Sequence, residues 1–200
     1  KIRELRAENP DGSAFFCVGD ALSGTPIAAL VNGISVIEVL NAIPYDTFTL
    51  GNHEFDWGPD VLTESMKSFD FPVLCANITY SDSGQLLDGA IPYVILEKNG
   101  VKIGVLGLTT EATPSIIRAN YAEAICVEDT TACAARYVPE IREKGADLVI
   151  IAGHLPLYEG ENGAPYTGEL YDIAMNVEGI DAIFGGHNDT LNAAELINGI

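Results

Sequence analysis

Four polar side chains in this 200-residue sequence each follow a short apolar run that ends in glycine, and together they could bind metal ions. They are Asp20, Asn52, His154 and His187. A carboxylate, an amide and two imidazoles form an oxygen-and-nitrogen ligand set that suits Mn²⁺, Zn²⁺, Mg²⁺ or Fe. A carboxylate such as Asp20 can also bridge two ions. Paired ions about 3.5–4 Å apart activate water and stabilise displacement at phosphorus.

Each of these residues, taken alone, also has a structural explanation. Asp20 could cap a helix or stabilise a turn, and a histidine at a strand end is often structural. Repetition argues against that explanation, because all three histidines of the sequence lie at such strand ends: His53, His154 and His187.

His53 follows Asn52 directly and has Asp56 three residues further on. Asp56 could accept a hydrogen bond from His53, fix its tautomer and raise its basicity. A histidine held in this way can stabilise charge on a transferring phosphoryl group or protonate the leaving oxygen, while Asn52 binds a metal or a phosphate oxygen. The alternative is that Glu54 and Asp56 are surface acids at the start of a turn, and the spacing leaves both interpretations open.

The apolar runs are rich in β-branched and aromatic residues, which is typical of short strands buried on both faces. Strands are expected at residues 15–18, 47–50, 73–76, 93–97, 102–108, 148–152 and 182–184, and helices at 26–41, 59–68, 129–144 and 167–176. Pro139 should kink or divide the third helix. Asn99-Gly100 predicts a hairpin with a type I′ turn. The alternation indicates an α/β fold whose strand ends would gather the four polar residues.

The charge and the cysteines exclude several classes of protein. Twenty-nine acidic residues against 10 basic ones give a net charge of −19. Such a surface repels polyanions, so a non-specific binder of polymeric nucleic acid is excluded. A small anionic substrate is compatible with this charge if bound cations supply positive charge locally. The four cysteines lack the spacing of a zinc knuckle or a disulfide framework, and no apolar stretch reaches transmembrane length.

The block from Gly51 to Gly58, with the sequence GNHEFDWG, resembles the signature of the 5'-nucleotidase branch of the calcineurin-like metallophosphoesterases. That branch includes UDP-sugar hydrolases and 2',3'-cyclic phosphodiesterases. Similar segments follow the family's order over most of the chain: Gly19-Asp20, Gly24-Thr25-Pro26, Asn41 with Tyr45-Asp46, Cys75-Ala76-Asn77-Ile78, Gly104–Thr109, Gly153-His154 and Gly185-Gly186-His187.

The resemblance implies roles for these residues. Asp20 would bridge two divalent ions, and Asn52, His154 and His187 would be further ligands. His53 and Asp56 would form a catalytic dyad, with Asn52 and His53 facing the phosphate. The implied fold is an α/β sandwich of two mixed sheets flanked by helices. The implied reaction is hydrolysis of a phosphate ester, most often a 5'-nucleotide, by a metal-bound hydroxide without a covalent phospho-enzyme. Family members are mostly periplasmic, secreted or attached to the cell surface.

Two features depart from the family pattern. Members carry an Asp-x-His motif on a first strand, whereas the 19 residues before Asp20 contain no histidine. Asp189 stands where the family usually has histidine, and it is a further candidate ligand. We interpret residues 1–200 as a fragment of the catalytic domain that lacks its first and closing strands and the nucleoside-binding C-terminal domain. One ion would then be weakly bound or lost, activity would be weak or absent, and an exposed sheet edge could pair two chains.

Two alternative functions are compatible with the sequence. The chain could be a non-catalytic domain that keeps the fold for binding or as a scaffold, although the pair His53 and Asp56 has no evident use there. It could also be an enzyme that acts on cyclic nucleotides or UDP-sugars. An Asp-x-His motif upstream in the parent protein would favour the enzyme over the scaffold.

Overall fold

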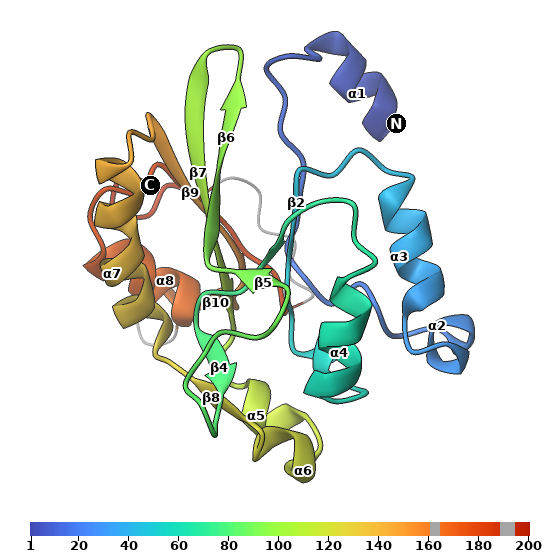
Figure 1. Cartoon of the computed structure of the whole chain (residues 1–200). Coiled ribbons are helices and arrows are strands. Elements are labelled where there is room, and N and C mark those ends of the chain that lie inside the picture. Colours follow the sequence, from blue (N-terminus) through green and yellow to red (C-terminus); the bar gives the residue numbers. More distant parts are fainter. Residues whose placement is uncertain (161–164, 189–194) are drawn as a thin grey trace.

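Two four-stranded sheets pack against each other at the centre of the computed structural model, which describes residues 1–160, 165–188 and 195–200. Helices cover the outer faces, with α7 and α8 on one side and α3 and α4 on the other (Figure 1). The helices are α1 (Ile2–Glu8), α2 (Pro26–Leu30), α3 (Ile34–Asn41), the 3₁₀ helix η1 (His53–Phe55), α4 (Pro59–Met66), α5 (Thr113–Ile116), α6 (Ala119–Ala122), α7 (Thr130–Glu143) and α8 (Glu169–Asn176).

The first sheet has the order β1–β2–β3–β5, and its strands are all parallel. They are β1 (Phe16–Cys17), β2 (Thr47–Thr49), β3 (Val73–Leu74) and β5 (Ala90–Ile91). The second sheet has the order β12–β9–β7–β6, in which β6 alone is antiparallel to its neighbour. Its strands are β6 (Tyr93–Lys98), β7 (Val101–Thr109), β9 (Leu148–His154) and β12 (Ala182–Phe184).

Two small antiparallel pairs complete the described strands. One joins β4 (Ile78–Tyr80) to β8 (Ile125–Val127), and the other joins β10 (Tyr158–Glu159) to β11 (Tyr166–Thr167). The α/β fold with flanking helices that the sequence predicts is therefore confirmed.

The predicted hairpin is also confirmed. Lys98 of β6 lies opposite Val101 of β7, and both Asn99 and Gly100 between them have positive φ, at 51° and 79°. A type I′ turn requires positive φ at both central positions, which asparagine and glycine tolerate best. This hairpin is the tall pair of green strands in Figure 1.

Two of the predicted helices differ in the structure. Instead of one helix over 26–41, α2 ends at Leu30 and α3 begins at Ile34, because Asn32 and Gly33 adopt positive φ (49° and 82°). A Cβ at Gly33 would lie only 3.0 Å from the Cβ of Leu22, so this turn is packed tightly.

The fourth predicted helix, at 167–176, is shorter than expected, since Thr167 belongs to β11 and α8 begins at Glu169. By contrast, α7 passes through Pro139 without a break, so the expectation of a divided helix is wrong. Its buried face, including Val138 and Ile141, packs on the second sheet and supports the helix despite the missing hydrogen bond.

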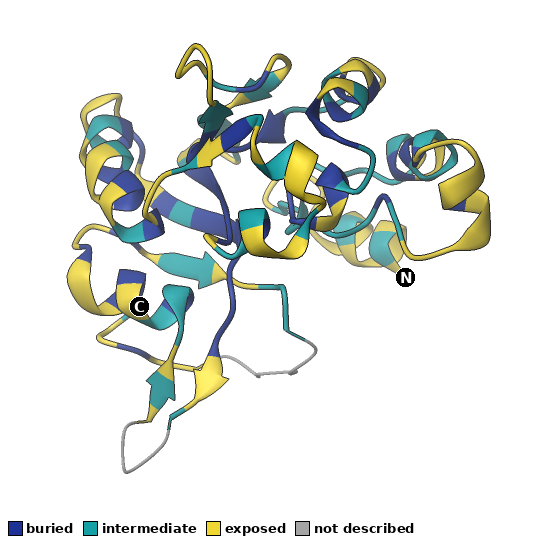
Figure 2. Cartoon of the chain, turned by 90° about the horizontal axis from the view of Figure 1, so that it is seen from below, coloured by how far each residue is buried: buried dark blue, intermediate teal, exposed yellow. Residues whose placement is uncertain are grey.

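Three apolar clusters define the layers. One lies between the second sheet and α7 and α8, and a second lies between the first sheet and α3 and α4. The third lies between the sheets, where Leu74 of β3 meets Val105 of β7 and Ala152 of β9. Figure 2 shows the buried residues concentrated in the central strands, with exposed residues on the outer faces of the helices. No described helix combines the length and hydropathy that a membrane span requires.

Candidate active site

The carboxyl ends of strands from both sheets bring four of the predicted residues together. Asp20 follows β1 and Asn52 follows β2 in the first sheet, whereas His154 ends β9 and His187 follows β12 in the second. The Nε2 atom of His154 lies 2.9 Å from Oδ2 of Asp20 and 3.1 Å from Oδ1 of Asn52. The Nδ1 atom of His187 lies 3.0 Å from the same Asn52 oxygen. We call these four residues the acceptor cluster.

A backbone carbonyl fixes the tautomer of His154. Its Nδ1 atom lies 2.9 Å from the carbonyl oxygen of Val18 and donates a proton to it. When Nε2 has lost its own proton, its lone pair points at Asp20, Asn52 and His187. A backbone carbonyl behind a histidine is a common partner of a metal ligand.

The donor set fits a divalent cation. The ligand atoms of Asp20, His154 and His187 all lie within 4.8 Å of one another, and the amide oxygen of Asn52 adjoins both imidazoles. Nitrogen and carboxylate or amide oxygen atoms with lone pairs directed at one point need a positive charge between them, supplied either by a proton or by a cation.

The electrostatics of the cluster are dominated by the contact between Asp20 and His154. Burial raises the pKa of Asp20, but the hydrogen bonds and charges of His154 and His53 together lower it below its ordinary value. Burial lowers the pKa of His154, but the contact with Asp20, the carbonyl of Val18 and the charge of Glu54 together raise it above its ordinary value. Burial and the charge of His154 both lower the pKa of His187. A cation in the cluster would compete with the Nε2 proton of His154, so binding would release a proton.

The two loops that follow β1 and β2 approach so closely that glycine is required on both. A Cβ on Gly19 would lie 2.6 Å from the backbone nitrogen of Gly51, and a Cβ on Gly51 would lie 2.2 Å from Oδ1 of Asp20. Asp20 and His187 themselves adopt positive φ, at 57° and 76°. Residues other than glycine rarely take this conformation, although aspartate and histidine tolerate it better than most, and such strained positions are enriched at active sites.

Buried threonines join the two sheets beside the acceptor cluster. The hydroxyl of Thr49 in the first sheet donates to the carbonyl of Ala152 in the second, at 2.7 Å. The hydroxyl of Thr109 in the second sheet donates to the carbonyl of Leu50, at 2.6 Å. This hydroxyl therefore satisfies a buried backbone carbonyl, and the bond also fixes one sheet against the other.

His53 and Asp56 form a contact at the rim of the cluster. The Nδ1 atom of His53 lies 3.1 Å from Oδ2 of Asp56, and the two side chains are 49% and 36% exposed. The backbone N–H of His53 donates to Oδ1 of Asp20 at 2.9 Å. With Nδ1 held by Asp56, Nε2 is the nitrogen of His53 that a bound molecule could reach.

Glu54 is a buried residue, so the interpretation of Glu54 as a surface acid is wrong. Its residue surface is only 1% exposed, and its carboxylate accepts four backbone N–H groups. Burial raises the pKa of Glu54, the charge of Asp20 raises it further, and the N–H donors lower it. The local sequence gave no signal of this role, because the spacing from Gly51 to Glu54 does not reveal which loops meet in space.

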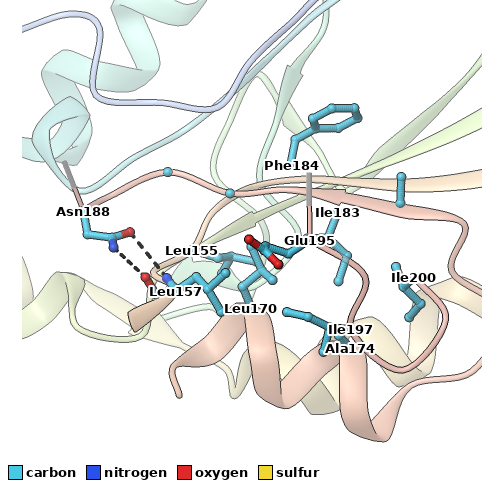
Figure 3. A pocket seen from close by; sticks show the side chains of 13 residues that line it. Leu155, Leu157, Leu170, Ala174, Ile183, Phe184, Asn188, Glu195, Ile197 and Ile200 are labelled. Atoms are coloured by element: carbon cyan, nitrogen blue, oxygen red, sulfur yellow. Dashed lines mark hydrogen bonds between the residues drawn. The ribbon is translucent and has the colours of Figure 1, made fainter. Parts of the chain in front are cut away.

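Asp189 lies outside the described residues. Its neighbour Asn188 donates from Nδ2 to the carbonyl of Leu157 at 2.6 Å, which fixes the end of the loop that carries His187 (Figure 3). Beside this loop, between β12 and α8, lies an apolar cavity of about 600 Å³. Leu155, Leu170 and Ile183 contribute to its wall, but no member of the acceptor cluster does.

Known proteins resemble the chain in sequence and in structure. A family model described as calcineurin-like phosphoesterase matches residues 1–188. A 5'-nucleotidase of Vibrio cholerae is 35% identical over 193 residues, which cover 94% of this chain and 34% of that protein. A 2',3'-cyclic-nucleotide 2'-phosphodiesterase/3'-nucleotidase of Haemophilus influenzae is 33% identical over 213 residues, with coverage of 95% and 31%.

The crystal structure of the calcineurin-like phosphoesterase YfkN from Bacillus subtilis matches with a TM-score of 0.78 at 29% identity, over 93% of this chain and 61% of that one. The chain spans about a third of the length of the Vibrio and Haemophilus relatives. The family model covers nearly the whole chain, and the fold agrees with it. This chain belongs to the calcineurin-like phosphoesterase family.

Proposed function

We propose that this chain carries the catalytic metal site of a hydrolase that cleaves phosphate esters of nucleotides. The observation that supports the proposal is the acceptor cluster, which lies directly beside the contact between His53 and Asp56. The cluster would hold two divalent ions, with Asn52, His154 and His187 as ligands and Asp20 as a ligand of both ions. When bound, such ions supply positive charge for the phosphate and lower the pKa of water.

The residues of the chain itself would orient the substrate and move a proton. Water attacks phosphorus as the bond to the leaving oxygen breaks, so the products are phosphate and the free alcohol. The Nε2 atom of His53 would stabilise charge on the phosphoryl group and give a proton to the leaving oxygen. Asp56 would hold the Nδ1 proton and orient the ring so that Nε2 is free to face the substrate. Asn52 adds an oxygen ligand without adding charge.

Nucleotides are the substrate class that the relatives' names support. The Vibrio relative is named a 5'-nucleotidase and the Haemophilus relative a cyclic-nucleotide phosphodiesterase and 3'-nucleotidase. The net charge of −19 disfavours polymeric nucleic acid but permits a small anion at a cation site. We therefore propose 5'-nucleotides as the main substrates, and cyclic nucleotides or UDP-sugars as the alternative.

The organisation and location of the whole protein are part of the same proposal. The relatives are about three times as long as this chain, which supports a further domain that binds the nucleoside. A periplasmic, secreted or surface location is proposed from the family resemblance. Pairing of two chains is proposed at β1 or β12, because both are edge strands of their sheets.

The test is phosphate release by the complete parent protein with Mn²⁺ from 5'-AMP, 2',3'-cyclic AMP and UDP-glucose. We expect metal-dependent turnover that is highest on 5'-AMP and that collapses in the His53→Ala variant. Preference for the cyclic ester or UDP-glucose would reassign the substrate while keeping the reaction. A folded parent protein that is inert on all three substrates with every divalent ion would favour the scaffold instead.

A further inference from the structure

The carboxylate of Glu54 lies buried between the two loops that carry Asp20 and Asn52. Its Oε2 atom accepts the backbone N–H of Asp20 at 2.8 Å and that of Gly51 at 2.6 Å. Its Oε1 atom accepts the N–H groups of Ala21 at 2.9 Å and Leu22 at 3.0 Å. One side chain from the second loop thus binds three successive N–H groups of the first loop and one of its own.

Asp20 makes the reciprocal contact. Its Oδ1 atom accepts the backbone N–H of His53 at 2.9 Å, while its Oδ2 atom faces His154. Each loop therefore gives one carboxylate to the backbone of the other. Glu54 holds Asp20 in its positive-φ conformation, and this conformation directs Oδ2 into the acceptor cluster.

Four donors around one side chain require a charged acceptor. An ionised carboxylate has two oxygens and about four lone-pair positions and carries no proton, which matches the four N–H groups. Glutamine offers one oxygen and an NH₂ group, so at least two of these N–H groups would face a donor. Hydrogen bonds to an ionised acceptor are stronger than neutral ones, which offsets the cost of burying the charge.

We propose that Glu54 is a positioning residue for metal binding, which acts by fixing Asp20 without touching the ion or the substrate. This proposal rests on the proposed function, because it assumes that Asp20 is a metal ligand. Removing a residue that hydrogen-bonds a metal ligand typically lowers metal affinity or activity by about 10–100-fold. We expect a loss of that size from Glu54→Gln.

The experiment measures Mn²⁺ affinity of the parent protein by isothermal titration calorimetry, and the melting temperature of each variant by circular dichroism. Glu54→Gln should raise the Kd for Mn²⁺ by about 10–100-fold. Raising the Mn²⁺ concentration above the new Kd should restore much of kcat, because His53 and Asp56 stay in place. Glu169→Gln is the matched control, since Glu169 is half-buried and accepts from Thr110 and Glu111 but contacts no member of the acceptor cluster. It should lower the melting temperature and leave the Kd unchanged.

The outcomes separate the two proposals. If the wild type binds none of Mn²⁺, Zn²⁺, Mg²⁺ and Fe²⁺, the proposed function fails. If the wild type binds Mn²⁺ and Glu54→Gln binds it equally well, the positioning role is overturned while the proposed function stands. If Glu54→Gln does not fold, Glu54→Asp takes its place, because it keeps the charge but is one methylene too short for all four N–H groups. A Kd raised about tenfold or more in Glu54→Asp supports the proposal, and an unchanged Kd overturns it.

Discussion

The Nε2 atom of His154 lies 2.9 Å from Oδ2 of Asp20, and this contact joins the ends of two different sheets. Asp20 follows β1, the edge strand of the first sheet, whereas His154 ends β9 in the interior of the second. Neither sheet alone contains the acceptor cluster. The cluster therefore depends on the sheets staying together.

The hydroxyl of Thr109 should matter for both stability and metal binding, because it joins the sheets beside the cluster. Thr109→Val leaves the buried carbonyl of Leu50 without its 2.6 Å donor. An unsatisfied buried group costs about 1–3 kcal/mol, so urea unfolding should show a loss of that size, together with weaker Mn²⁺ binding. Thr79→Val on β4, outside the two main sheets, is the control. Equal effects of the two substitutions would contradict a special role for the cross-sheet bond.

Loss of the His53 side chain should lower the rate of catalysis strongly while metal binding persists. The backbone N–H of His53, not its ring, donates to Asp20, so His53→Ala keeps that contact. General acid–base groups contribute about 10²–10⁴-fold, and we expect kcat for 5'-AMP hydrolysis to fall within that range. The Kd for Mn²⁺, from calorimetry, should not change. A large rise in this Kd would show that the ring of His53 is a metal ligand and not a substrate contact.

Mn²⁺ should raise the melting temperature of the wild type but hardly that of His187→Ala. A ligand at 100 times its Kd stabilises the folded state by about 2.7 kcal/mol. For a domain of this size that corresponds to a shift of roughly 5–10 °C, at about 2–4 °C per kcal/mol. His187→Ala removes one of the three residues whose ligand atoms converge. An equal shift in both proteins would place the bound ion elsewhere in the chain.

The sequence predicted those parts of the site that depend on one strand and its end. Asp20, Asn52 and His154 come directly after or at the end of apolar runs, and the rule that ligands collect at strand ends was enough to predict that they meet. The contact between His53 and Asp56 is local, with only two residues between the partners in sequence, and its spacing was informative for that reason.

The parts that could not be predicted depend on two distant loops meeting. Glu54 looks like an ordinary acid next to a turn until the loop after β1 lies against it, and only then do four N–H groups surround it. The break between α2 and α3 is different, because Asn32-Gly33 is a local turn signal of the same kind as Asn99-Gly100, and both of its residues adopt positive φ. At Pro139 the predicted division of the helix does not occur, because packing on the sheet supports a continuous α7.

The four free cysteines should differ sharply in reactivity, in an order set by burial. Burial raises the pKa of Cys17 and Cys75 to about 11 and that of Cys133 to about 12, whereas Cys126 on β8 is exposed. Only the thiolate is nucleophilic, so at pH 8 the three thiols with raised pKa stay protonated and react slowly. Their reaction should accelerate as the pH rises towards 11.

An Ellman titration of the folded protein at pH 8 should therefore show one fast thiol and three slow ones. Cys126→Ser should remove the fast phase and leave the slow ones, and denaturant should make all the remaining thiols fast. The three slow residues lie on β1, directly after β3 and in α7, so their exposure reports opening of the sandwich. A fast reaction of the buried Cys75 or Cys133 in the folded wild type would mean that the sandwich opens under native conditions, and the acceptor cluster would then be only transiently assembled.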